Sequence, residues 1–85
     1  MLNIKVLGSG CTNCINLEKL CREVASENQI EAAIEKVTDF KEIMSYGIMS
    51  TPGLVLNGKV VSSGKLPTKS TLDHWMMNAL AEENA

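Results

Sequence analysis

The stretch GSGCTNC, residues 8–14, places two cysteines three positions apart, directly after an apolar run and directly before a helical pattern. The run LNIKVL at residues 2–7 alternates in polarity as a half-buried strand does, and apolar side chains then recur at helical spacing. Cys11 therefore stands at the start of a helix predicted over residues 12–28, with Cys14 one turn further in. Three uses of the pair are open: a redox dithiol, a metal clamp and a structural disulfide.

Composition and charge limit the class of protein. The chain has 85 residues, 45% hydrophobic but only 4% aromatic, with a formal net charge of −2. We expect one domain over residues 1–85 with a small, mostly aliphatic core. The slightly acidic balance argues against nucleic-acid binding, and no basic cluster or long apolar stretch indicates contact with a membrane. We expect a monomer that binds neither nucleic acid nor a membrane.

Three cysteines weigh against a disulfide scaffold, since small secreted domains stapled by disulfides usually carry an even number. The first residues also lack a secretory signal pattern, because Lys5 interrupts a short apolar run. We therefore expect a cytoplasmic protein, in which a pair such as Cys11 and Cys14 serves catalysis or metal binding more often than structure. Cys21 lies too far along the helix to pair with either, and its apolar neighbours favour a core position.

The middle of the chain predicts a second strand and a short helix. Residues 30–37 carry the strand pattern IEAAIEKV. Thr38 or Asp39 is suited to cap the helix that follows, and Gly47 is suited to end it.

The last third predicts a hairpin and a final helix. LVL and VV flank an Asn57-Gly58 turn, a strong signal for a type I′ hairpin, and a helix is expected over residues 68–82. The resulting order is β-α-β-α-β-β-α. A right-handed crossover makes the first two strands parallel, and the hairpin adds an antiparallel pair. We therefore predict an α/β fold with a four-stranded mixed sheet and three helices, which are distributed over its two faces.

This order, with CxxC opening the first helix and Thr51-Pro52 before the hairpin, resembles the thioredoxin fold. The chain is similar to small thioredoxin-like and glutaredoxin-like redox-active disulfide proteins in GSGCTNC, in EIMSYGIMSTPGLVLNGKVVSSGKLP and in the closing helix. The resemblance implies a thiol–disulfide oxidoreductase without cofactor or metal, whose partners are protein disulfides and a disulfide reductase. It further implies that the Thr51–Pro52 bond is cis and that Pro52 lies beside the cysteines.

The two cysteines are expected to have different roles. Cys11 is the expected nucleophile, because unpaired N–H groups and the dipole at a helix start favour a thiolate and lower the thiol pKa toward neutrality. Cys14, nearer the apolar face, is the expected resolving cysteine, which attacks the mixed disulfide formed on Cys11. The expected substrate-binding residues are Thr51, Pro52, Gly10, Thr12 and Asn13.

Several positions depart from familiar members of that family. Gly10 stands where a Trp usually precedes the first cysteine, and Thr12-Asn13 replace Gly-Pro between the cysteines. Lys5 occupies the position where larger thioredoxins carry a buried acid, and SSGKLPT stands where a glutaredoxin would carry its glutathione motif. The proton route to Cys14 and any glutathione dependence are therefore left open.

The main alternative is a CxxC module that binds Cu(I) or zinc. The loop also resembles that of heavy-metal-associated domains, in which two thiolates bind Cu(I). Those domains carry Met two positions before the first cysteine, where this chain has Ser9, and they end in a strand rather than a helix. Zinc would need two further ligands. A third interpretation is an interaction domain that merely retains CxxC, but it leaves Thr51-Pro52 without a role. We assign no role to His74.

Overall fold

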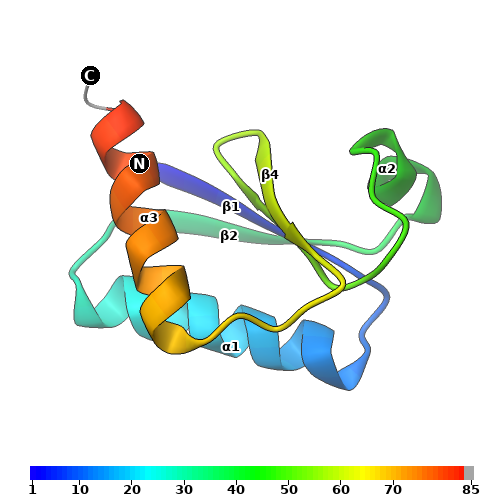
Figure 1. The fold of residues 1–85 in the computed structure, drawn as a ribbon, viewed down its shortest axis with the longest axis horizontal. Coiled ribbons are helices and arrows are strands. Elements are labelled where there is room, and N and C mark those ends of the chain that lie inside the picture. The colour runs from blue at the N-terminus through cyan, green and yellow to red at the C-terminus, as the bar shows by residue number, and fades with distance from the viewer. Residues whose placement is uncertain (84–85) are drawn as a thin grey trace.

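The computed structural model describes residues 1–83 and contains one four-stranded sheet and three helices within them (Figure 1). Strands β1 and β2 are parallel, and the pairs β1–β3 and β3–β4 are antiparallel, in the order β2-β1-β3-β4. The predicted fold class and element order are therefore confirmed. The elements are β1 (Leu2–Leu7), α1 (Thr12–Glu27), β2 (Ala32–Val37), α2 (Phe40–Ser45), β3 (Gly53–Leu56), β4 (Lys59–Ser63) and α3 (Lys69–Glu83).

Alternation along β1 divides the core between the two faces of the sheet. Leu2, Ile4 and Val6 are buried in the larger cluster, to which α1 and α3 contribute. Leu7 belongs to a smaller cluster that includes Val37 of β2 and Ile43 of α2. The helices α1 and α3 thus cover one face, and α2 covers the end of the other face (Figure 1). β1 ends at Leu7, and the loop of residues 8–11, called the cysteine loop below, joins it to α1.

The second strand begins later than the sequence pattern indicated, at Ala32 rather than at residue 30. The backbone leaves α1 through Gln29, which has a φ of 54°, and the N–H of Ile30 donates to the carbonyl of Ala25 at 2.8 Å. The N–H of Ile30 is therefore used in closing the helix. Ile30 still packs against the larger core cluster, as its place in the apolar pattern required.

Local signals at the other boundaries work as expected. Asp39, not Thr38, caps α2, since its side chain accepts from the N–H of Lys41 at 3.2 Å. Gly47 follows α2 with a φ of 78°. Asn57 and Gly58 have φ values of 51° and 84°, the two positive angles that a type I′ turn requires.

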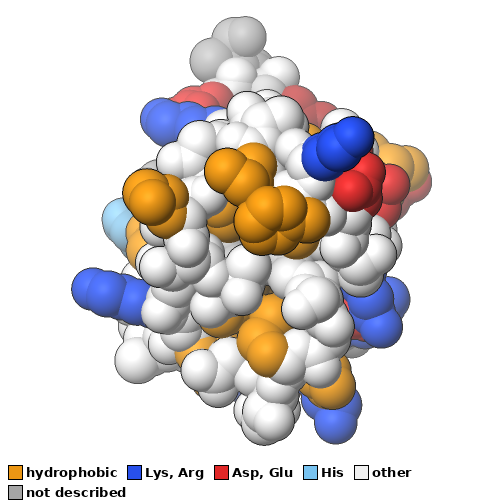
Figure 2. Space-filling model, turned by 90° about the vertical axis from the view of Figure 1, so that its right-hand side faces the viewer, with side chains coloured by type: hydrophobic (Ala, Val, Ile, Leu, Met, Phe, Trp, Pro, Cys, Tyr) orange, Lys and Arg blue, Asp and Glu red, His pale blue; other side chains and the backbone are white. Residues whose placement is uncertain are grey.

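Several exposed apolar side chains lie in α2 and in the loop after it, namely Phe40, Met44 and Met49. Figure 2 faces this end of the molecule and shows hydrophobic side chains near its middle, with charged side chains at its margins. None of the three helices within residues 1–83 has the length and hydrophobicity needed to cross a lipid bilayer.

Candidate active site

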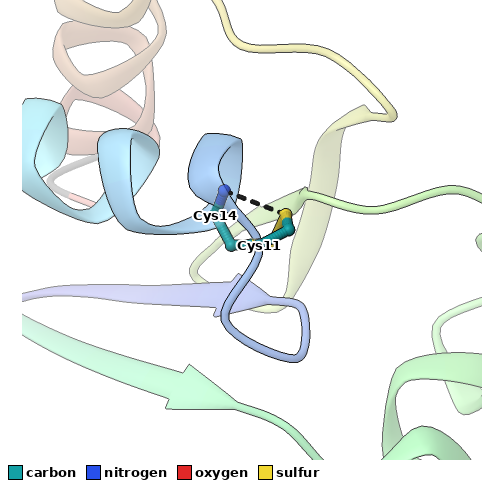
Figure 3. Close-up of a disulfide and its surroundings, with 2 residues drawn as sticks. All are labelled: Cys11 and Cys14. Carbon is teal, nitrogen blue, oxygen red and sulfur yellow. Dashed lines mark hydrogen bonds between the residues drawn. A yellow bond between two sulfur atoms is a disulfide. The ribbon is translucent and has the colours of Figure 1, made fainter.

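Cys11 and Cys14 form a disulfide at the start of α1, with their Cα atoms 5.0 Å apart (Figure 3). Cys11 is the N-cap residue: its backbone is extended, with φ −63° and ψ 163°, and its carbonyl accepts from the N–H of Ile15 at 3.0 Å. Its sulfur accepts from the N–H of Cys14 at 3.1 Å. One of the otherwise unpaired N–H groups of the helix start therefore faces the sulfur of Cys11.

The two cysteines differ in exposure. Cys11 is exposed, whereas Cys14 keeps only 5% of its accessible surface. Thr12 and Asn13, between them, are also exposed. Gly10 precedes the pair with a φ of 93°, a conformation that favours glycine, and a side chain there would meet no atom within 4 Å. An approaching molecule therefore meets Cys11 and these three neighbours before it meets Cys14.

The Thr51–Pro52 segment lies beside the cysteine loop. Its peptide bond is cis. Pro52 is buried and Thr51 is exposed. Gly8 lies between Cys14 and Thr51, because a Cβ built on it would contact Cys14 and would stand 3.7 Å from the Cβ of Thr51. The structure thus brings together all the residues that the sequence analysis assigned to the site.

The sequence analysis did not single out Gly64, which supports this segment. Its N–H donates to the carbonyl of Pro52 at 2.8 Å, and its φ is 75°. A Cβ on Gly64 would stand 2.8 Å from the Cβ of Ser50, too close for two side chains. The available signal was a glycine directly after the second strand of a hairpin, where positive φ values are common.

An apolar hollow of about 350 Å³ adjoins the cysteine loop. Phe40 and Met44 of α2 are 72% and 52% exposed, and Met49 of the following loop is 97% exposed. All three side chains line the hollow, and Figure 2 shows hydrophobic side chains gathered on the face at this end of the molecule. The residues that line the hollow are Ser9, Thr38, Phe40, Ile43, Met44, Ile48, Met49, Ser50 and Thr51.

Lys5 is directed away from the cysteines. Because side chains alternate along β1, it lies on the face opposite the one that Val6 presents to the α1 side. Its ammonium donates to the hydroxyl of Tyr46 at 3.1 Å and lies 3.9 Å from a carboxylate oxygen of Glu35. The hydrogen bond to Tyr46, with a smaller contribution from Glu35, raises the pKa of Lys5. The site therefore has a lysine paired elsewhere at the position where larger thioredoxins carry an acid.

Cys21 is a core residue, as predicted. It is 0% exposed and packs within the larger cluster between the sheet and the helices. Burial raises the pKa of its thiol to about 12. His74 is exposed, with Nε2 3.2 Å from Nδ2 of Asn78. In residues 1–83, no three His, Cys, Asp or Glu side chains are grouped as metal ligands would be.

Comparisons with protein families and with curated proteins both match thioredoxins. A family model described as a thioredoxin domain matches residues 2–77. Over 72 residues the chain is 35% identical to a thioredoxin of Methanothermobacter thermautotrophicus, covering 85% of this chain and 94% of that protein. Over 68 residues it is 34% identical to a thioredoxin of Methanocaldococcus jannaschii, covering 80% and 78% of the two chains.

A solved structure shares the fold. The crystal structure of the germline-specific thioredoxin Deadhead from Drosophila melanogaster matches with a TM-score of 0.64, covering 91% of this chain and 79% of that one. The sequence identity of this pair is 19%, so the likeness concerns the fold alone.

Proposed function

Because this chain belongs to the thioredoxin domain family and is a thiol–disulfide oxidoreductase of that kind, we propose that it reduces protein disulfides through Cys11 and Cys14. The observation that carries the proposal is the asymmetry of the pair. Cys11 is exposed and caps α1, whereas Cys14 is buried one turn further in. One thiol is therefore accessible to a substrate, and the other is held where it reaches only the first.

Cys11 begins the reaction. The N–H of Cys14 faces the sulfur of Cys11 in the disulfide, and in the reduced protein this N–H and the N-terminal end of the α1 dipole would stabilise the thiolate of Cys11. The thiolate attacks one sulfur of the substrate disulfide. A mixed disulfide between Cys11 and the substrate forms, and the first substrate sulfur leaves as a thiolate that takes up a proton from water.

Cys14 completes the reaction. Its thiol releases a proton to solvent, and the thiolate attacks the sulfur of Cys11. The Cys11–Cys14 disulfide forms, and the second substrate sulfur leaves as a thiolate and is protonated. Two electrons have then passed from the protein dithiol to the substrate. Cys21 takes no part, because it is buried and its thiol stays protonated at neutral pH.

The surroundings of the pair suit a polypeptide substrate. Thr51 is exposed next to buried Pro52, and its backbone is the part that would pair with an extended strand of the substrate. Gly10, Thr12 and Asn13 provide the small or polar border around Cys11. The apolar hollow beside Thr51 offers a place for a side chain that flanks the substrate disulfide. A small soluble disulfide would leave most of this surface unused.

Turnover requires a reductant. A disulfide reductase, or dithiothreitol in a laboratory assay, returns the Cys11–Cys14 disulfide to the dithiol. We propose that the protein works as a monomer in the cytoplasm, where such reductases keep thiols reduced.

The metal-binding alternative is not favoured. Heavy-metal-associated domains end in a strand, whereas the described part of this chain ends in α3 after a β3–β4 hairpin. The Thr51–Pro52 segment beside the cysteines also argues against metal binding, because a site that binds Cu(I) through two thiolates has no use for it.

The proposal is tested by following the reduction of a disulfide-containing test protein by dithiothreitol. We expect the wild-type protein to accelerate the reaction, and Cys11→Ser to abolish the acceleration. Cu(I) titration of the reduced protein is the companion measurement. A tight one-to-one Cu(I) complex together with no acceleration would contradict the proposal and favour the metal-binding module.

A further inference from the structure

Gly8 occupies the space next to the sulfur of Cys14. It is buried directly after the end of β1, six residues before Cys14 in the sequence. A Cβ built on Gly8 would overlap the Sγ of Cys14 and would stand 3.3 Å from its Cβ. The space that a side chain would need is therefore taken by one of the two reacting sulfurs.

The need for glycine here is one of space and not of backbone conformation. Gly10, Gly47, Gly58 and Gly64 have positive φ values, but Gly8 does not. An alanine at Gly8 would therefore keep an ordinary backbone conformation. Its methyl group alone would create the conflict.

The backbone around Gly8 has little room to move. Its N–H donates to the carbonyl of Val37 at 2.9 Å, which continues the β1–β2 pairing by one residue. Cys14 is buried in the first turn of α1, and its own N–H is bonded to Cys11. The group that can yield is the sulfur of Cys14, by rotation about its Cα–Cβ bond.

We infer that Gly8 is a positioning residue, which holds open the place that the sulfur of Cys14 takes when it bonds to Cys11. The inference rests on the proposed function and extends it to the balance between the two redox states. In the disulfide, the sulfur of Cys14 has one position. In the dithiol, it can rotate away from an added methyl group. A side chain at Gly8 therefore disfavours the disulfide more than the dithiol, and it slows the attack of Cys14 on a mixed disulfide.

The test is the redox equilibrium of Gly8→Ala with a glutathione buffer, in which glutathione supplies or accepts the two electrons. The fractions of dithiol and disulfide are read from alkylation and mass spectrometry. We expect the equilibrium to shift toward the dithiol by about tenfold, the order of effect of an off-rotamer side chain. Tenfold corresponds to a reduction potential about 30 mV higher.

Gly58→Ala is the matched control. Gly58 has a φ of 84°, and a Cβ added there would meet no atom within 4 Å, so alanine strains the hairpin turn without touching the cysteines. We expect it to lower stability and leave the redox equilibrium unchanged. An unchanged equilibrium in Gly8→Ala, or an equal shift in both variants, would overturn the role of Gly8. Failure of the wild-type protein to exchange disulfides would instead overturn the proposed function.

A second variant keeps the inference testable where Gly8→Ala does not fold. Adding Cys14→Ala to Gly8→Ala removes the overlapping sulfur. Recovery of the fold in the double variant, measured by urea unfolding, supports the inference. A double variant that also fails to fold overturns it, because the cost would then not come from the sulfur of Cys14.

Discussion

The backbone N–H of Cys14 donates a hydrogen bond of 3.1 Å to the sulfur of Cys11. Cys11 is the N-cap residue of α1, and its sulfur accepts from the N–H of Cys14, so the first turn of the helix fixes both cysteines relative to each other. Cys11 is exposed and Cys14 is buried, and the proposed function assigns the two thiols different roles because of this difference. The predictions below depend on that difference.

Alkylation rates should rank the three cysteines. In the reduced native protein near pH 7, we expect iodoacetamide to label Cys11 first and Cys21 last, with the pKa of Cys11 below the ordinary thiol value of about 8.5. Cys21 should react only after unfolding in urea, because it is buried. The labelled positions are read by peptide mass spectrometry. Equal rates for Cys11 and Cys21 would show that the assigned exposures are wrong.

Phe40 should affect substrate binding more than chemistry. Its ring is 72% exposed beside the cysteine loop, so Phe40→Ser removes apolar area that a polypeptide substrate would cover. We expect KM for a protein disulfide to rise about three- to tenfold, with kcat little changed. Met77→Ser is the control, because Met77 is 49% exposed on α3, away from this hollow. Similar effects of the two variants would argue against a role for the hollow.

Lys5 should not set the pH dependence of the reaction. It bonds to Tyr46 on the face of the sheet opposite α1, so it is placed to exchange no proton with Cys14. We expect Lys5→Met to leave the pH profile of kcat within a few tenths of a pH unit of the wild-type profile. Steady-state rates between pH 6 and pH 9 provide the measurement. A shift of a full unit would place Lys5 on the proton route after all.

Cys21 should make stability depend on alkaline pH. In the unfolded chain its thiol ionises near 9.0, whereas the folded protein keeps it protonated up to about 12. A raised pKa in the folded state contributes stability that is complete below pH 9 and is lost as pH rises toward 12. With the Cys11–Cys14 disulfide intact, we expect this contribution to fall by roughly 1 kcal/mol at pH 10.

The control for that experiment is Cys21→Ala, which lacks the titrating thiol. Its free energy of unfolding, measured in urea, should fall less steeply than that of the wild-type protein between pH 8 and pH 10. Parallel pH curves for the two proteins would contradict the assigned burial of the thiol.

Much of the fold could be predicted from local patterns. Local interactions within a few residues determine several elements. Examples are the apolar spacing of α1, the polar cap at Asp39 and the Asn57-Gly58 turn. The one clear boundary error, the start of β2, arose because Ile30 combines a strand-like pattern with a backbone N–H used by the end of α1. Hydrophobic periodicity does not show where a hydrogen bond goes.

The parts of the site that could not be predicted depend on contacts between distant segments. Gly8 resembles any loop glycine in the sequence, and its role follows only from the sulfur that packs against it. The bond between Lys5 and Tyr46 joins residues 41 positions apart. The apolar hollow combines α2 with the loop before Pro52. Such relationships leave no regular spacing for a sequence analysis to detect.

The central claim, that Cys11 attacks and Cys14 resolves, is tested most directly by trapping the mixed disulfide. Cys14→Ser and Cys11→Ser are incubated separately with a protein that has one accessible disulfide, and the products are separated without reductant. We expect Cys14→Ser to accumulate a covalent complex through Cys11 that dithiothreitol cleaves, because buried Cys21 cannot displace the substrate. Cys11→Ser should trap far less, since Cys14 is itself buried. Equal trapping by both variants, or a complex attached through Cys14 or Cys21, would contradict the account.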